Sequence, residues 1–315
     1  MNEKTARQIE GMKNQTIGVE VEMNNITRSR AAKVAAEFFG TGRYQDTSSR
    51  NGYCAWSAWD SEGREWKFMR DVSIEGPDSE KCELVTPILT YKDIETLQEL
   101  IRQLRHAGAK SDASRGCGVH IHIGANGHTA QTLRNLANIM ASHERLLAEA
   151  LNLDSGRISR YCRTVDPTFL GKLNRIKPTT MAALADIWYG NSSRYDRNQH
   201  YNHSRYRMLN LHATFTKGTV EFRLFQFDRP DGQRKGGLHA GQLKSYIQLC
   251  LALSQMAKMV RTASPKPQQH ENPKYAMRTW LLRLGFIGDE FATARELLTK
   301  RLSGDASFRS GRAAA

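Results

Sequence analysis

The chain has few cysteines, and their arrangement argues against two common uses of that residue. Five Cys occur in 315 residues, at positions 54, 82, 117, 162 and 250. Their number is odd and no CxxC pair is present, which disfavours both a disulfide framework and a zinc cage. The sequence therefore predicts reduced, mostly packed thiols and a cytoplasmic protein.

Several targeting and nucleotide-binding signals are also missing. Residues 1–15 lack the apolar core of a signal peptide, and the most apolar helix candidate, residues 246–260, is too short for a membrane span. The sequence has no GxxxxGK[ST] motif and no GxGxxG after a strand, so neither a P-loop nor a Rossmann site is expected. Zinc fingers, RNP-like motifs and basic regions followed by heptads are absent too. Any phosphate binding must then come from metal ions and arginines.

Composition indicates a globular protein with a basic surface. The chain is 39% hydrophobic and 25% charged, and its length fits one large or two modest domains. The net charge of +14, concentrated in residues 156–207 and 256–315, points to nucleic acid or a phosphate-rich or acidic substrate. A merely solvated basic surface explains it equally well.

Three short segments alternate strictly between apolar and polar residues. Side chains of a strand point alternately to its two faces, so each segment predicts a strand with one core face and one polar face. If the three share a sheet, carboxylates, imidazoles and a guanidinium gather on one face, where they are candidates for binding divalent metal and phosphate. Solvated outward positions are the alternative, but Lys, Ser and Thr are nearly absent from these positions. The segments are IGVEVEM (17–23), VHIHI (119–123) and VEFRL (220–224).

Strands and helices alternate along the chain without repeats. Strands are predicted at residues 16–24, 66–74 and 82–87, and residues 206–212 with 218–227 are predicted to form a hairpin. Hairpins and short loops favour an α+β fold with a mostly antiparallel sheet and flanking helices. The basic stretch 156–205 contains one predicted helix, residues 178–189, and from Gly237 onward the pattern is helical.

Six segments, taken in order, resemble the amidoligase family, a branch of the carboxylate–amine ligases that include glutamine synthetase and glutamate–cysteine ligase. The matching residues span Gly18 to Phe225, about two thirds of the chain. One departure is Val72, where the family usually has Gly. The segments are GVEVE (18–22), DVSI (71–74), ELVTPIL (83–89), CGVHIHIG (117–124), RYRMLNL (205–211) and GTVEFRLF (218–225).

This resemblance implies a fold and a reaction. The fold is a curved antiparallel sheet forming a glutamine-synthetase-like half-barrel, with ATP and two or three Mg²⁺ on its concave face. The implied reaction activates a carboxylate as an acyl phosphate, which an amine then attacks. Residues 1–235 are expected to form the catalytic domain, with 156–205 as a basic insertion or cap, and residues 236–315 a helical region packed on it.

The resemblance also implies roles for individual residues. The metal ligands are Glu20, Glu22, Glu83 and Glu221, with His120 or His122 completing the shell and the other contacting nucleotide. Arg223 is expected at the γ-phosphate, because its fork suits bidentate contact. Arg205, Arg207 and Asn210 are expected to position phosphate and carboxylate groups, and Asp71 to orient the amine or a water on the metal.

Two other functions remain open, together with the identity of the substrates. The first is a metal-dependent hydrolase or nuclease that uses the same Glu/His face. The second is a basic nucleic-acid-binding protein. The carboxylate and amine substrates are unspecified, the basic excess suits a peptide or other acidic macromolecule, and a homo-oligomer is compatible with the sequence. Weaker candidates are a Cys117 nucleophile, base stacking on Trp56, Trp59 or Trp66, and His200, His203 and His212, which lack partners at metal-ligand spacing.

Overall fold

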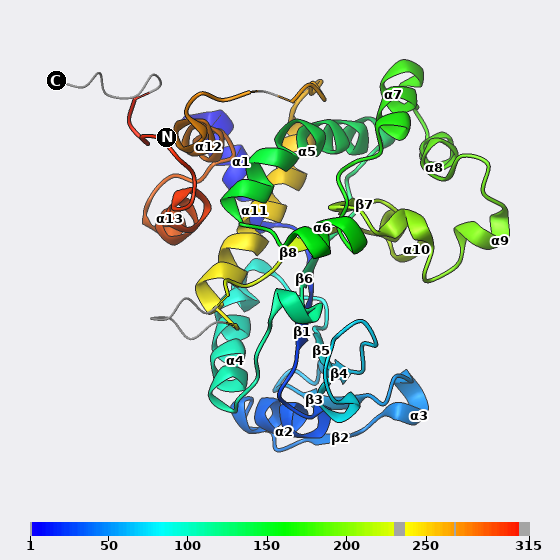
Figure 1. Ribbon diagram of the computed structural model, residues 1–315, viewed down its shortest axis with the longest axis vertical. Coiled ribbons are helices and arrows are strands. Elements are labelled where there is room, and N and C mark those ends of the chain that lie inside the picture. The colour runs from blue at the N-terminus through cyan, green and yellow to red at the C-terminus, as the bar shows by residue number, and fades with distance from the viewer. Residues whose placement is uncertain (1, 230–236, 268, 309–315) are drawn as a thin grey trace. The chain divides into compact units, whose positions relative to one another are not determined.

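The computed structural model describes residues 2–229, 237–267 and 269–308 and contains two compact units (Figure 1). The predicted boundary between residues 235 and 236 lies outside the described residues, so the division into a catalytic domain and a C-terminal region stays a prediction. The sheet unit comprises Thr16–His122 and Leu224–Lys244, and the helical unit comprises Met1–Gln15, Ile123–Arg223 and Ser245–Ala315.

The sheet unit is built on strands in the order β2-β3-β4-β5-β1-β6. The pairs β2/β3, β3/β4, β4/β5 and β5/β1 are antiparallel. The predicted α+β class with a mostly antiparallel sheet is confirmed, while the half-barrel shape stays a prediction. The strands are β1 (Ile17–Met23), β2 (Tyr44–Asp46), β3 (Trp56–Trp59), β4 (Glu65–Met69), β5 (Cys82–Val85) and β6 (Val119–Gly124), whose last two residues belong to the helical unit.

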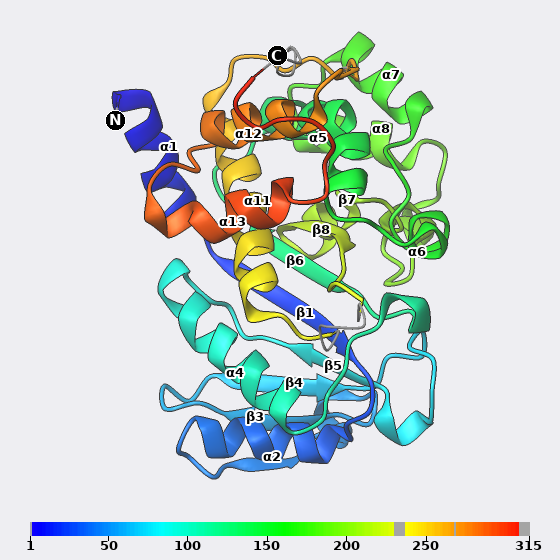
Figure 2. The ribbon, with the colours of Figure 1, turned by 60° about the vertical axis from the view of Figure 1, so that its left-hand side comes forward.

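One face of this sheet is apolar and is covered by helices. Val19, Val21 and Leu84 point to that face and are buried, as the alternation in β1 and β5 requires. Helix α2 packs on β3, β4 and α4, and its buried residues are all alanines, which permit close approach (Figure 2). The helical elements are α2 (Arg28–Phe38), α3 (Ser48–Asn51), α4 (Ile94–His106) and the 3₁₀ turns η1 (Asp78–Glu80), η2 (Tyr91–Asp93) and η3 (Ala113–Arg115).

The strand predicted at residues 66–74 is shorter than expected. β4 ends at Met69, because the Asp71 carboxylate accepts a hydrogen bond from the Ser73 N–H at 2.7 Å and turns the chain. Asp71 therefore lies in a loop rather than on the sheet.

The helical unit packs its long helices around buried polar contacts as well as apolar side chains. Asn135 of α5 donates to the carbonyls of Ala257 and Val260 at the end of α11, and Gln8 of α1 donates to Ala252. Helices α12 and α13 lie side by side (Figure 1). The elements are α1 (Glu3–Lys13), α5 (Ala130–Ala150), α6 (Ser155–Arg160), α7 (Pro167–Ile176), α8 (Met181–Tyr189), α9 (Arg194–Arg197), η4 (His203–Arg205), β7 (Leu209–Asn210), α10 (His212–Lys217), β8 (Thr219–Phe225), α11 (Ala240–Met259), α12 (Pro273–Arg283), η5 (Asp289–Phe291) and α13 (Ala292–Thr299); β8 and α11 each have residues in both units.

The predicted hairpin is correct in its pairing and wrong in its shape. β7 and β8 are antiparallel, with Asn210 opposite Glu221, but β7 has two residues. The Asn210 side chain accepts the His212 N–H at 2.8 Å, which starts the short helix α10 where an extended strand was expected.

The basic stretch 156–205 is more helical than predicted. Besides α8, which fits the predicted helix at 178–189, it contains most of α6 and all of α7 and α9. The Asp154 and Asp166 carboxylates accept the first free N–H groups of α6 and α7, and Pro167 opens α7. These caps were visible in the sequence, but the short polar helices behind them carry little periodicity.

Among the described residues, no helix combines the length and apolarity that a membrane crossing requires. None of the five cysteines, all of them described, forms a disulfide; Cys54 is exposed and the other four are buried, in agreement with the expected packed thiols.

Glu144 is buried within α5 and stabilises the segment that follows α6. Both of its carboxylate oxygens lie within hydrogen-bond distance of the Val165 N–H, at 3.0 and 3.1 Å. Burial raises the pKa of Glu144 to about 7, against the lowering effect of that N–H and of Arg207. The folded protein therefore holds this proton in a pH range where the unfolded chain has released it.

We expect Glu144 to make unfolding depend on pH. The contribution of Glu144 to the free energy of unfolding is fully present below the ordinary pKa of 4.5 and is lost as pH rises through about 7. The total loss is at most about 3 kcal/mol. Urea unfolding of the wild type and Glu144→Gln at pH 5 and pH 8 measures this loss, which the variant should lack. Glu149→Gln, exposed on the same helix, is the control. Equal pH slopes in all three proteins would contradict the assignment.

Candidate functional site

The polar face of the sheet unit brings carboxylates together by strand register. Glu22 of β1 lies directly opposite Glu83 of β5, and Glu20 lies opposite Val85, so the three glutamates share one face. Like charges placed directly opposite each other destabilise a sheet. The arrangement therefore needs a positive charge above this face.

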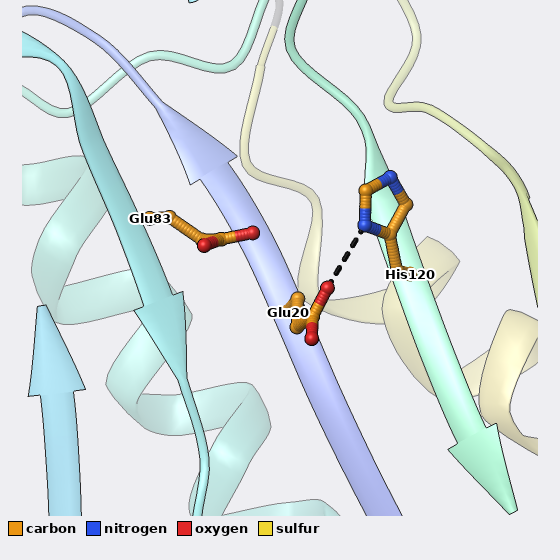
Figure 3. Close-up of side chains that lie close together, drawn as sticks. All are labelled: Glu20, Glu83 and His120. Carbon is orange, nitrogen blue, oxygen red and sulfur yellow. Dashed lines mark hydrogen bonds and ion pairs between the residues drawn. The ribbon is translucent and has the colours of Figure 1, made fainter. Parts of the chain in front are cut away.

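Histidines of β6 complete the same face. The His120 Nδ1 atom lies 3.0 Å from Glu20 Oε2, while Glu83 projects toward them from β5 (Figure 3). His120 Nε2 is 3.7 Å from Glu22, and His122 Nε2 is 3.3 Å from Glu20. Both imidazoles are buried, His120 with 3% and His122 with 7% exposure.

These contacts decide the charge of Glu20. Burial by itself raises the pKa of Glu20, but the facing His122 and His120 together lower it well below its ordinary value. Glu22 receives the Gly118 N–H at 2.5 Å, a bond that favours an ionised carboxylate. Glu20 is thus ready to act as an anionic ligand at neutral pH.

Two sets of donor atoms on this face fit a metal ion. Within each set, one atom per residue lies within 4.8 Å of the others: Glu20, Glu83 and His120 form one set, and Glu22, Asp71 and Glu83 form the other. Glu83 belongs to both. Carboxylate oxygens dominate, which suits hard cations such as Mg²⁺ and Mn²⁺, and one imidazole is compatible with Mn²⁺.

Asp71 reaches this cluster because of a glycine in another loop. Gly116 has φ +81°, and a Cβ atom there would lie 2.5 Å from the Ser73 carbonyl oxygen. The Glu75 N–H also donates to the Arg115 carbonyl at 2.8 Å. The Asp71 loop is therefore seated on η3, and Gly116 is needed both for its backbone conformation and for this close approach.

Lys67 is a polar-face residue that the sequence reasoning missed. It lies on β4 opposite Val85, which in turn lies opposite Glu20, so Lys67 and Glu20 share the face two strands apart. It is half-buried and makes no hydrogen bond or ion pair with the described residues. Alternation in EWKFM (65–69) contains this signal, since it places Lys67 on the face opposite the apolar Trp66 and Phe68.

The helical unit holds the remaining predicted residues. Glu221 is buried and accepts from Arg223 Nη1 at 2.5 Å and from Asn210 Nδ2 at 2.6 Å. The Arg223 guanidinium also lies over the Tyr206 ring, 5.8 Å from its centroid. Sequence reasoning thus selected three residues that the structure joins in one network.

Arg205 and Arg207 line separate cavities of the helical unit. Arg205 lines one of about 180 Å³ together with Asn210 and Glu221. Arg207 lines one of about 280 Å³, donates to the Thr164 carbonyl and pairs with Asp166 at 3.0 Å. Within the helical unit, Glu221, Arg223 and Asn210 are therefore linked by hydrogen bonds, Arg205 shares a cavity with two of them, and Arg207 lines another cavity.

The weaker candidates take structural positions. Trp66 is fully buried against Phe39 and donates to Asp60, whereas Trp56 and Trp59 are half-buried. Cys117 is buried with 1% exposure.

Comparison with known proteins identifies a family and a distantly similar structure. A family model described as "Putative amidoligase enzyme" matches residues 13–254. The crystal structure of a bifunctional glutathione synthetase from Pasteurella multocida is similar with a TM-score of 0.43 and 12% identity, over 94% of this chain and 48% of that one. The chain thus spans about half the length of that protein. The structural similarity is too weak to support a conclusion about fold or function. No curated protein matches the chain.

Replacing Gly116 should displace the Asp71 loop. We expect Gly116→Ala to lower the free energy of unfolding by at least about 2 kcal/mol, because strained backbone and the clash with Ser73 add. Gly63→Ala is the matched control, since Gly63 has φ +77° and open space around its Cβ position. Urea unfolding of both variants measures the difference. Equal losses of unfolding free energy in the two variants would show that the contact with Ser73 does not contribute to stability.

Removing one charge from the carboxylate cluster should raise the thermal stability of the metal-free protein and lower the stability that is gained from metal. We expect Glu83→Gln to raise the melting temperature of the metal-free protein by relieving repulsion worth about 1 kcal/mol, and to abolish the stabilisation that Mg²⁺ or Mn²⁺ gives the wild type. Glu95→Gln, exposed on α4, makes the same charge change away from the cluster. Thermal melting in EDTA measures the change in the metal-free protein, and thermal melting in millimolar metal measures the stabilisation that metal gives. A variant that still gains stability from metal like the wild type would rule out the assigned ligand.

Proposed function

The chain belongs to the amidoligase family, and we propose that it is an ATP- and Mg²⁺-dependent ligase that joins a carboxylate to an amine. One observation carries the proposal: Glu20, Glu22, Glu83, Asp71 and His120 gather on the polar face of one sheet. Two overlapping sets dominated by carboxylate oxygens would suit divalent cations that neutralise the charge of nucleotide phosphates. This agrees with the metal chemistry that the family resemblance implies.

The reaction explains why such a face is needed. Amide formation from a free carboxylate is uphill in water, so the acid must first be activated. A carboxylate oxygen of the substrate attacks the γ-phosphorus of ATP and ADP leaves; the amine nitrogen then attacks the acyl carbon, loses a proton and displaces inorganic phosphate. When bound, Mg²⁺ supplies neutralisation of the triphosphate charge. The protein's part is to hold the cations and orient both substrates.

In the sheet unit, each residue of the cluster has a proposed role. Glu22, Asp71 and Glu83 would hold one cation, and Glu20, Glu83 and His120 another. His122, whose Nε2 lies 3.3 Å from Glu20, is proposed to contact nucleotide. Asp71 lies in a loop rather than on a strand, so it is the member best able to adjust to an incoming amine.

The helical unit is proposed to supply the cationic groups. Arg223 is the proposed contact of the γ-phosphate, with its guanidinium held by Glu221 and the Tyr206 ring. Arg205 and Asn210 are proposed to position phosphate or carboxylate groups, and Arg207 is a further candidate. Glu221 is assigned as a metal ligand by the family resemblance.

Nucleotide binding tests the proposal most directly. We expect Mg²⁺ with ADP, or with a non-hydrolysable ATP analogue, to raise the melting temperature by several degrees, since a ligand at 100 times its dissociation constant adds about 2.7 kcal/mol. Glu20→Gln should lose this shift and the exposed control Glu95→Gln should keep it. The measurement is thermal melting with each component alone and combined.

The opposite results identify the alternative. A shift with Mn²⁺ or Zn²⁺ alone, unchanged by any nucleotide, would contradict the ligase and favour a metal-dependent hydrolase that uses the same carboxylates. A nucleotide shift that survives in Glu20→Gln would separate nucleotide binding from the carboxylate cluster. A positive result justifies trapping of the acyl phosphate with hydroxylamine to identify the acid.

A further inference from the structure

A small cavity of the helical unit is lined mainly by polar side chains, among them two cationic ones. Its volume is about 180 Å³, below the range of sites that enclose drug-sized ligands. We call it the Arg205 pocket. Its lining side chains include Asn198, His200, Arg205, Asn210, His212, Lys217 and Glu221.

Arg205 is held in this pocket without a carboxylate partner. Its Nη1 donates to the His200 carbonyl at 2.9 Å, and its guanidinium lies 5.6 and 5.8 Å from the ring centroids of Tyr201 and Tyr206. Among the described residues no carboxylate comes within ion-pair distance of Arg205. The guanidinium is thus oriented by neutral groups and keeps its charge available for a ligand.

The one carboxylate in the lining does not cancel this charge. Glu221 is engaged by Arg223 at 2.5 Å and by Asn210 at 2.6 Å. His212 lies against the Tyr189 hydroxyl, 2.6 Å from its Nδ1, and burial lowers its pKa, so it is neutral at pH 7. Lys217 adds a second positive charge to the lining. The pocket is therefore electropositive.

We propose that the Arg205 pocket binds a carboxylate of the acid substrate other than the one that reacts, so that the acid is a small dicarboxylate or carries a second carboxylate. The inference rests on the proposed ligase function. A planar guanidinium matches a carboxylate with two parallel hydrogen bonds. Apart from Glu221, none of the lining residues is in a group of side chains that could hold a metal ion. The group bound here is therefore a recognition group, and the volume limits it to a small one.

Binding of succinate, without metal or nucleotide, tests this pocket. Ligand-observed NMR on the full chain should detect succinate binding to the wild type, at least tenfold weaker binding to Arg205→Gln, and no binding of the neutral analogue succinamide. Arg194→Gln is the matched control, because Arg194 is exposed in the same basic stretch and its loss changes the net charge equally. The control should keep the wild-type dissociation constant within twofold.

Each alternative result has a definite meaning. Failure of the wild type to bind succinate, or equal weakening in both variants, would overturn the proposal. Inorganic phosphate that binds through Arg205 while succinate does not would assign the pocket to a nucleotide phosphate instead. The melting shift with Mg²⁺ and ADP is measured separately. If that shift is absent while succinate still binds through Arg205, the ligase function fails and the carboxylate pocket stands.

Discussion

The facing pair Glu22 and Glu83 is the constraint on which the polar face of the sheet unit depends. Antiparallel register places these carboxylates opposite each other, and Asp71 brings a third acid within 4.8 Å. Carboxylates this close repel one another in the low dielectric of a partly buried site. In a sheet whose polar face is merely solvated, a lysine or a threonine would be expected at one of these positions. The repulsion is the physical reason to expect cations, and the Gly116 contact with Ser73 seats the Asp71 loop against η3.

Glutamates of the two units are used in opposite ways. Glu221 is buried but satisfied within its own network by Arg223 and Asn210. For Glu20, by contrast, the facing imidazoles of His122 and His120 lower the pKa well below its ordinary value. An arginine partner compensates the charge of a buried carboxylate, whereas carboxylates that face one another repel and favour a cation. The same residue type in two alternating strands thus has different surroundings, and its neighbours decide how its charge is compensated.

Much of the candidate site could be predicted because strand alternation is a local property. The segments around Glu20, His120 and Glu221 identified their polar faces without any knowledge of the fold, and family motifs added Glu83 and Asp71. Lys67 was missed although its segment alternates equally well, because none of the six family segments contains it. The helices between residues 156 and 205 were missed because they are short and polar, so that their side-chain caps, more than apolar periodicity, define them.

The sequence by itself determined which residues point to which face, because that depends only on the two-residue period of a strand. It also determined the family, through the order of six segments. Tertiary structure alone decided the register that places Glu22 opposite Glu83 and the turn that removes Asp71 from β4. It also decided the cavity in which Arg205 has no carboxylate within ion-pair distance. These features depend on pairing between residues distant along the chain, and loop closure and side-chain packing fix such pairing only when the whole unit folds.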